Sequence, residues 1–117
     1  MVSTQSATQT RQVFEHHLGA FAEGIDAVMA DYSPESVLLT PDKTYRGLAE
    51  IRAFFEAFIN GADAAFWDAF KVLAQNIEGP TAYLVWEAKP AVQMATDTLL
   101  VHDGKILTQS FTPLTGS

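Results

Sequence analysis

The stretch YRGLAEIRAFFEAF, residues 45–58, decides the fold because it encodes an amphipathic helix with an unusually aromatic face. Its apolar residues recur at steps of three and four, which places them on one side of a helix. These residues are Leu48, Ile51, Phe54, Phe55 and Phe58. The pattern predicts a helix from about Leu48 to Asn60, stopped at Asn60-Gly61. So aromatic a face needs another layer of structure to cover it.

Upstream of this helix, a second helical stripe runs from about Thr8 to Tyr32. Apolar residues follow it at steps of four and three: Phe14, Leu18, Phe21, Ile25, Val28 and Tyr32. Glu23-Gly24 divides the stripe into two helices, because glycine costs about 1 kcal/mol in a helix interior. Ser33-Pro34 ends the second helix, since a residue before proline avoids the helical region.

The remaining segments have the composition of strands. SVLLT (36–40) predicts a short strand, and PDKTY (41–45) a turn with a candidate second strand. After Ala65 come four segments rich in β-branched and aromatic residues: FWDAFKVLAQNI, TAYLVWEA, VQMATDTLLVH and KILTQSFT. Short turns separate them, of which Asp103-Gly104 is a strong hairpin signal.

Three helices followed by a strand meander predict an α+β fold, with the helices on one face of a curved antiparallel sheet. We expect a cone-like sheet of about four long strands plus a short one, with a pocket at its open end. The chain of 117 residues suits one domain, 1–117, with frayed ends at about 1–7 and 114–117.

Composition excludes several classes of partner. Asp and Glu outnumber Lys and Arg by 14 to 7, and a net charge of −7 without a basic cluster disfavours nucleic acid and anionic lipid. There is no cysteine, and no apolar run approaches the ~20 residues of a membrane span. The polar N-terminus MVSTQSATQT lacks the apolar segment of a secretion signal, so a cytoplasmic location is the default expectation.

Two segments resemble the nuclear transport factor 2-like superfamily, in particular its SnoaL-like and ketosteroid-isomerase-like branches. They are EGIDAVMADYSPESVLLTPDKTYRGLAEIRAFFEAF and the closing TDTLLVHDGKILTQSF, and the resemblance covers nearly the whole chain. It implies a cystatin-like α+β cone, but it leaves the function open. This fold serves isomerases, dehydratases, cyclases, epoxide hydrolases and non-catalytic modules.

The resemblance implies two catalytic positions, Asp97 and His17. Ketosteroid-isomerase relatives bind an oxyanion with an acid on a meander strand and a tyrosine on the first helix, which correspond here to Asp97 and His17. Asp97 alternates with Ala95 and Leu99, which suits an interior face, where burial raises the pKa of a carboxyl. The alternatives are that Asp97 faces solvent and that His17 is a partly buried histidine with a local hydrogen bond. His16 should point about 100° away, nearer to solvent.

The third family position, the general base, corresponds to Thr40, which cannot act as a carboxylate at neutral pH. This departure disfavours ketosteroid isomerisation by the usual route. The residues that we expect to contact a substrate are Tyr32, Thr40, Phe55, Trp67, Trp86, Leu99, Gln109 and Phe111.

No metal or cofactor site is evident in the sequence. No two histidines have an i, i+4 spacing, and there is no phosphate loop or nucleophile elbow. The resemblance implies a protein that binds a small apolar molecule and, if it is an enzyme, catalyses cofactor-independent acid–base chemistry such as isomerisation, dehydration, cyclisation or hydrolysis. The alternative is a non-catalytic ligand-binding or association module. Strands such as TAYLVWEA, apolar on both faces, predict a homodimer through the outer face of the meander.

Overall fold

A computed structural model describes residues 2–115, with side chains from residue 7 onward. The helices are α1 (Val2–Ala20), α2 (Ile25–Met29), α3 (Gly47–Gly61) and α4 (Ala64–Ala69). The strands are β1 (Tyr32–Leu39), β2 (Thr44–Arg46), β3 (Phe70–Glu78), β4 (Thr81–Ala88), β5 (Val92–His102) and β6 (Lys105–Thr115). Regular structure thus extends into both segments expected to fray, while residues 1, 116 and 117 lie outside the described ones.

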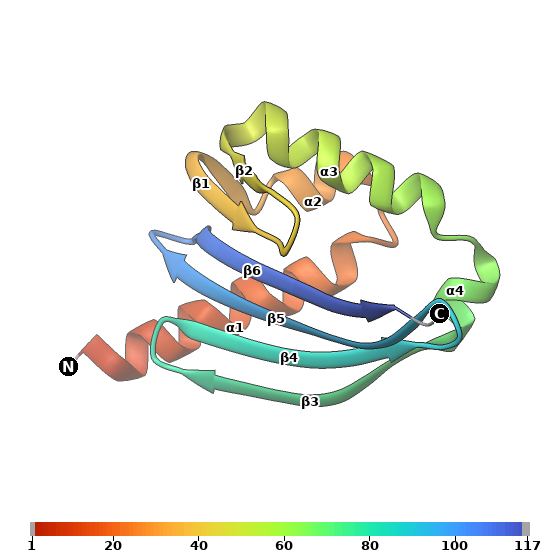
Figure 1. Cartoon of the computed structure of the whole chain (residues 1–117). Coiled ribbons are helices and arrows are strands. Elements are labelled where there is room, and N and C mark those ends of the chain that lie inside the picture. Colours follow the sequence, from red (N-terminus) through yellow and green to blue (C-terminus); the bar gives the residue numbers. More distant parts are fainter. Residues whose placement is uncertain (1, 116–117) are drawn as a thin grey trace.

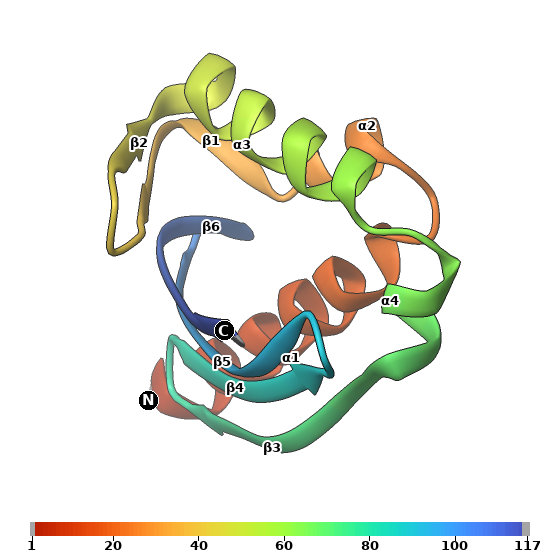
Figure 2. The same cartoon turned by 45° about the vertical axis from the view of Figure 1, so that its right-hand side comes forward.

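The strands form one six-stranded sheet in the order β2-β1-β6-β5-β4-β3. Every neighbouring pair is antiparallel except β1 and β6, which run parallel. The sheet curls around α1, and α3 crosses the end formed by β1 and β2 (Figures 1 and 2). The predicted α+β cone is confirmed, but the sheet is mixed. A parallel pair needs a long crossover, and α3, α4 and the four strands β2 to β5 supply it between β1 and β6.

Two boundaries differ from the sequence prediction. Tyr32, expected at the end of a helix, is the first residue of β1. A register shift between Tyr32 and Val37 accommodates Pro34 within that strand. The segment around Trp67, expected to be strand, forms α4, whose first turn is capped by Asp63 accepting a hydrogen bond of 2.9 Å from the Phe66 N–H.

Helix α3 covers the interior as its aromatic face predicts, with one exception. Ile51 and Phe55 are buried, and Phe54 and Phe58 pack partly buried against the core. Leu48 was expected in the core, but its position in the first turn leaves it 40% exposed. Gly47 begins the helix at φ +81°, a left-handed conformation that glycine adopts without strain. Within residues 2–115, no helix has the length and apolar character needed to cross a membrane.

Candidate functional site

The concave side of the sheet encloses a cavity of about 500 Å³ between α1, α3, α4 and strands β3 to β6. Its walls are mainly aromatic, and among the described residues Asp97 and His17 are its only ionisable lining groups. The lining residues are Phe14, His17, Leu18, Phe21, Ala22, Phe54, Phe55, Phe58, Trp67, Phe70, Leu84, Trp86, Asp97, Leu99, Gln109 and Phe111. This volume lies in the range of pockets that take a small organic molecule.

Asp97 is the buried acid of this cavity, only 8% exposed. Strand alternation places it on the inner face of β5 together with Ala95 and Leu99, as the sequence predicts. Its Oδ1 accepts a hydrogen bond of 2.8 Å from the Trp86 indole, and its Oδ2 one of 2.9 Å from the Gln109 amide. Burial raises the pKa of the Asp97 carboxyl, and these two hydrogen bonds and the nearby His17 offset part of that rise.

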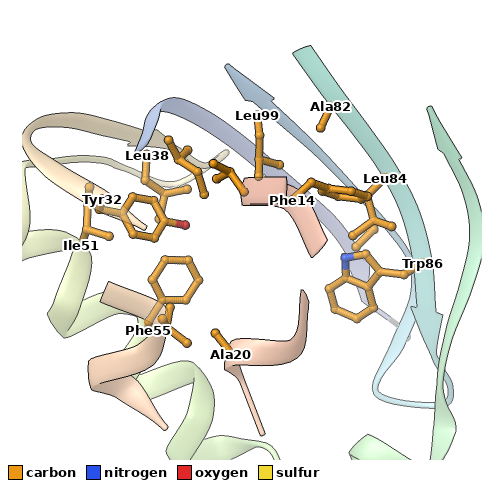
Figure 3. Packing of buried hydrophobic residues seen from close by; sticks show 14 of the residues in the cluster. Phe14, Ala20, Tyr32, Leu38, Ile51, Phe55, Ala82, Leu84, Trp86 and Leu99 are labelled. Carbon is orange, nitrogen blue, oxygen red and sulfur yellow. The ribbon is translucent and has the colours of Figure 1, made fainter. Parts of the chain in front are cut away.

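The Gln109 side chain connects Asp97 to Tyr32. Because its Nε2 donates to Asp97, its Oε1 is directed toward Tyr32, whose hydroxyl donates to it. Burial, followed by the charges of Asp97 and Asp31, raises the pKa of Tyr32 well above its ordinary value, so the phenol keeps its proton. Figure 3 shows the Tyr32 hydroxyl directed into the interior, with the Trp86 indole on the opposite wall. The acid is therefore held in a fixed orientation by a buried polar network.

His17 lines the same cavity from α1, and its side chain is 6% exposed. Its ring makes edge contacts with Phe21, Tyr32 and Phe55, at centroid distances of 5.2, 5.8 and 6.0 Å. Its Nδ1 lies 3.5 Å from Oδ2 of Asp31, a buried carboxylate between α2 and β1. The half-exposed His16 contacts the other oxygen of Asp31 at 2.8 Å. The two histidines, expected to diverge, thus converge on one carboxylate.

The other predicted contact residues fall into two groups. Phe55, Trp67, Trp86, Leu99, Gln109 and Phe111 line the cavity. Tyr32 lies behind Gln109 and touches the site through it. Thr40 was expected to contact the substrate, but it lies in the turn between β1 and β2 and is not part of the wall. Its hydroxyl donates to the Lys43 carbonyl at 2.8 Å, which fixes it in that turn.

Sequence reasoning missed Asp31, which no periodic pattern distinguishes from other acids of the chain. It also missed that the segment carrying Trp67 is the helix α4, although Asp63 three residues before Phe66 is a helix-capping signal. No group of three or more His, Asp or Glu side chains suited to a metal ion occurs within the described residues. The site is therefore an apolar cavity with a network-held acid on one wall and an imidazole on another.

No protein-family model and no curated protein matches the sequence. Solved structures, in contrast, match along nearly its whole length. An NTF2-like protein of unknown function from Mesorhizobium loti has a TM-score of 0.75 at 16% identity, covering 92% of this chain and 93% of its own. A SnoaL-like protein of unknown function from Burkholderia thailandensis has a TM-score of 0.72 at 13% identity, covering 92% of this chain and 95% of its own.

A third structure is a candidate ketosteroid isomerase from Kribbella flavida, with a TM-score of 0.71 at 13% identity, covering 96% of this chain and 82% of its own. At these identities the likeness establishes the architecture, and the activity has to be argued from the site. The chain has the nuclear transport factor 2-like fold, the α+β cone that it shares with these SnoaL-like and isomerase-like structures.

Proposed function

We propose that this protein binds a small, mostly apolar molecule in its cavity and catalyses cofactor-independent acid–base chemistry on it. The reaction class is isomerisation, dehydration, cyclisation or hydrolysis, with Asp97 and His17 as the proton-transferring pair. The observation that carries the proposal is the buried Asp97 carboxyl on the wall of an apolar cavity that His17 also lines. Perturbed carboxyls in such cavities are typical of catalytic sites.

The composition of the wall restricts the substrate. No Lys or Arg belongs to the described lining, so nothing there neutralises a phosphate or a carboxylate, and burying such an anion would be costly. The aromatic walls favour a flat, largely apolar body; Trp86 and Phe111 lie with their ring planes parallel within 2°. A carbonyl, hydroxyl or epoxide oxygen on this body can accept a hydrogen bond from Asp97 in its protonated form.

The two polar groups divide the chemistry between them. The raised pKa of Asp97 favours the neutral acid, which donates a proton or hydrogen bond to a substrate oxygen as negative charge develops there. His17, the other ionisable group of the described lining, is the proton acceptor of this proposal. Thr40 is outside the wall, so the proton acceptor of this proposal differs from that of ketosteroid isomerases.

The experiment is proton exchange in deuterated water, followed by NMR, on a panel of uncharged cyclic ketones, enones and epoxides. Protein-dependent deuterium incorporation next to a carbonyl, or epoxide opening, supports acid–base catalysis. Asp42→Asn, which changes an exposed acid in the turn after β1, is the control and should leave the rate unchanged. Binding of panel members without any exchange or turnover contradicts the enzymatic proposal.

A non-catalytic ligand-binding role is the second candidate, and one observation favours it. Both oxygens of Asp97 already accept hydrogen bonds from the protein, as a purely structural carboxylate would. The chain has two tryptophans, Trp67 and Trp86, and both line the cavity. Intrinsic fluorescence therefore reports binding directly, and saturable quenching without turnover supports this second role.

A further inference from the structure

Two buried polar atoms face each other behind the cavity wall. Nδ1 of His17 and Oδ2 of Asp31 lie 3.5 Å apart, and neither has a hydrogen-bond partner among the described residues. Leaving a buried donor or acceptor unpaired costs about 1–3 kcal/mol. The two atoms are therefore natural hydrogen-bond partners, and a movement of a few tenths of an ångström would join them.

The chemistry of the two groups decides where the proton lies. An ionised carboxylate only accepts hydrogen bonds, so Nδ1 of His17 has to carry the hydrogen that faces Asp31. In a neutral imidazole this leaves Nε2 with a lone pair. Nε2 lies on the opposite side of the ring, away from Asp31, and the ring forms part of the cavity wall.

Asp31 is itself held from two sides. His16 contacts its Oδ1 at 2.8 Å from the solvent side, and its backbone carbonyl accepts a hydrogen bond of 2.7 Å from the Ile106 N–H. A fixed carboxylate behind an imidazole selects one tautomer and one ring orientation. On the cavity side, His17 lies near the Tyr32 phenol and interacts with the charge of the Asp97 carboxyl across the cavity.

We infer that Asp31 is a positioning residue for His17, holding the imidazole with Nδ1 protonated and Nε2 as a proton acceptor toward the cavity. The approach of Asp31 to His17 is a geometric observation, while its use in a reaction rests on the proposed function. It assigns complementary roles to the two cavity groups: His17 accepts a proton at Nε2, and Asp97 supplies one. His16 is the outer support of the carboxylate and takes no part in proton transfer.

The test is the tautomer of His17, read from long-range proton–nitrogen NMR spectra of uniformly ¹⁵N-labelled protein at a pH where the imidazole is neutral. The wild-type protein should show the Nδ1–H form as the major species. Asp31→Ala should shift the population to the Nε2–H form, whereas His16→Gln, which changes the outer side of the carboxylate, should leave Nδ1–H as the major form. A wild-type His17 that is mainly Nε2–H, or one unchanged in Asp31→Ala, overturns the inference.

The wild-type spectrum alone can refute the assignment if Asp31→Ala does not fold, and no substrate is required. A failed search for turnover therefore leaves this test intact, and a failed tautomer test leaves the role of Asp97 intact. Where a panel substrate is turned over, Asp31→Ala should lower kcat by about 10²-fold, the usual contribution of one general base, with little change in ligand binding. An unchanged kcat in a folded Asp31→Ala protein also contradicts the positioning role.

Discussion

At the scale of single residues, the site depends on which groups donate and which accept. Asp97 receives two hydrogen bonds, and the Gln109 amide that supplies one of them is oriented by Tyr32. The direction of the hydrogen bonds through Gln109 can be reversed, because a phenol hydroxyl can also accept a hydrogen bond. If the Gln109 amide rotates by half a turn, its Nε2 donates to Tyr32 and its Oε1 accepts from an amide at position 97.

Asp97→Asn is therefore expected to fold and to bind ligand nearly as well as the wild type. The Oδ1 of the introduced asparagine keeps the hydrogen bond from Trp86, and the rotated Gln109 amide accepts a hydrogen bond from the asparagine NH₂ group. The variant cannot transfer a proton, so turnover of any panel substrate should fall by about 10²-fold or more. Rates measured beside fluorescence titrations separate binding from chemistry, and an unchanged rate would end the catalytic role of Asp97.

Burial of Asp97 also predicts a pH dependence of stability. Its pKa is raised in the folded state above the ordinary value of 3.8, so the folded protein binds this proton more tightly than the unfolded chain. That contribution is complete below the unfolded pKa and is lost as the pH rises through the folded pKa.

Urea unfolding of wild type and Asp97→Asn, from about pH 3 to about pH 7, isolates this group from the other carboxyls. The free energy of unfolding of the wild type should decline relative to the variant as the pH rises. A difference that stays constant over this range would show that Asp97 titrates alike in both states.

At the scale of elements, the apolar face of α3 both packs on the core and lines the cavity. Phe55 is 4% exposed and packs against Tyr32 at a centroid distance of 5.6 Å, while Phe54 and Phe58 reach Phe111 at 6.0 and 6.3 Å. The aromatic face that the sequence displays thus covers β1 and forms one wall of the site. This face therefore encloses the cavity inside the cone.

Truncating this face should be costly only where the side chain is buried. Phe55→Ala is expected to lower the free energy of unfolding by roughly 3–5 kcal/mol, the usual loss for a buried phenylalanine. Leu48→Ala, at a position 40% exposed on the same helix, should cost under about 1 kcal/mol. Equal losses in a denaturant titration would contradict the orientation of α3.

The two glycines that bound α3 provide a matched test of backbone conformation. Gly47 has φ +81°, and an added Cβ would meet only ordinary contact at 3.5 Å from the Pro34 carbonyl oxygen. Gly47→Ala should therefore destabilise through strain, by about 1–2 kcal/mol. At Gly61, which lacks a positive φ and has open space, alanine should be neutral or stabilising by up to about 1 kcal/mol. Thermal unfolding of both variants measures the difference between their stabilities, and this difference would vanish if the turn at Gly47 relaxed.

At the scale of the whole molecule, the outer face of β4, β5 and β6 has a central area without charged side chains. Three cross-strand rows of β4, β5 and β6 form it: Thr81, Leu100 and Thr108; Tyr83, Thr98 and Ser110; and Val85, Thr96 and Thr112. The chain carries a net charge of −7, so two copies approach most easily through a neutral surface. Hydroxyl groups both donate and accept, so this face is also complementary to itself.

We expect a homodimer through this outer face. Leu100→Lys, at a residue 38% exposed in the face, should shift light scattering at micromolar concentration from dimer to monomer, because it places like charges close to each other. Leu48→Lys on α3 makes the same change at a residue 40% exposed and should leave the dimer intact. A wild-type protein that scatters as a monomer would refute the proposal.

Local pattern was enough to predict most of the architecture. The periodic apolar residues of α3, the break at Gly24, the Asp103-Gly104 turn and the alternation around Asp97 each depend on neighbours in the chain, so the sequence alone indicates them. The same alternation grouped Asp97 with Leu99, and Gln109 with Phe111, each pair on one face of its strand. Local pattern misjudged Tyr32 and the α4 segment, because apolar and aromatic residues fit either a helix or a strand there.

The sequence by itself determined the α+β class, the aromatic helix face and the grouping of Asp97 with Ala95 and Leu99 on one strand face, because periodicity and strand alternation are properties of contiguous residues. The tertiary structure decided that this strand face is the interior one. Only the tertiary structure decided the parallel pairing of β1 with β6, the Tyr32–Gln109–Asp97 network and the approach of Asp31 to His17. These depend on groups up to 77 positions apart, such as Tyr32 and Gln109, which meet only when the sheet curls around α1. The structure also decided the place of Thr40, whose hydroxyl donates to the Lys43 carbonyl within the β1–β2 turn, outside the cavity wall.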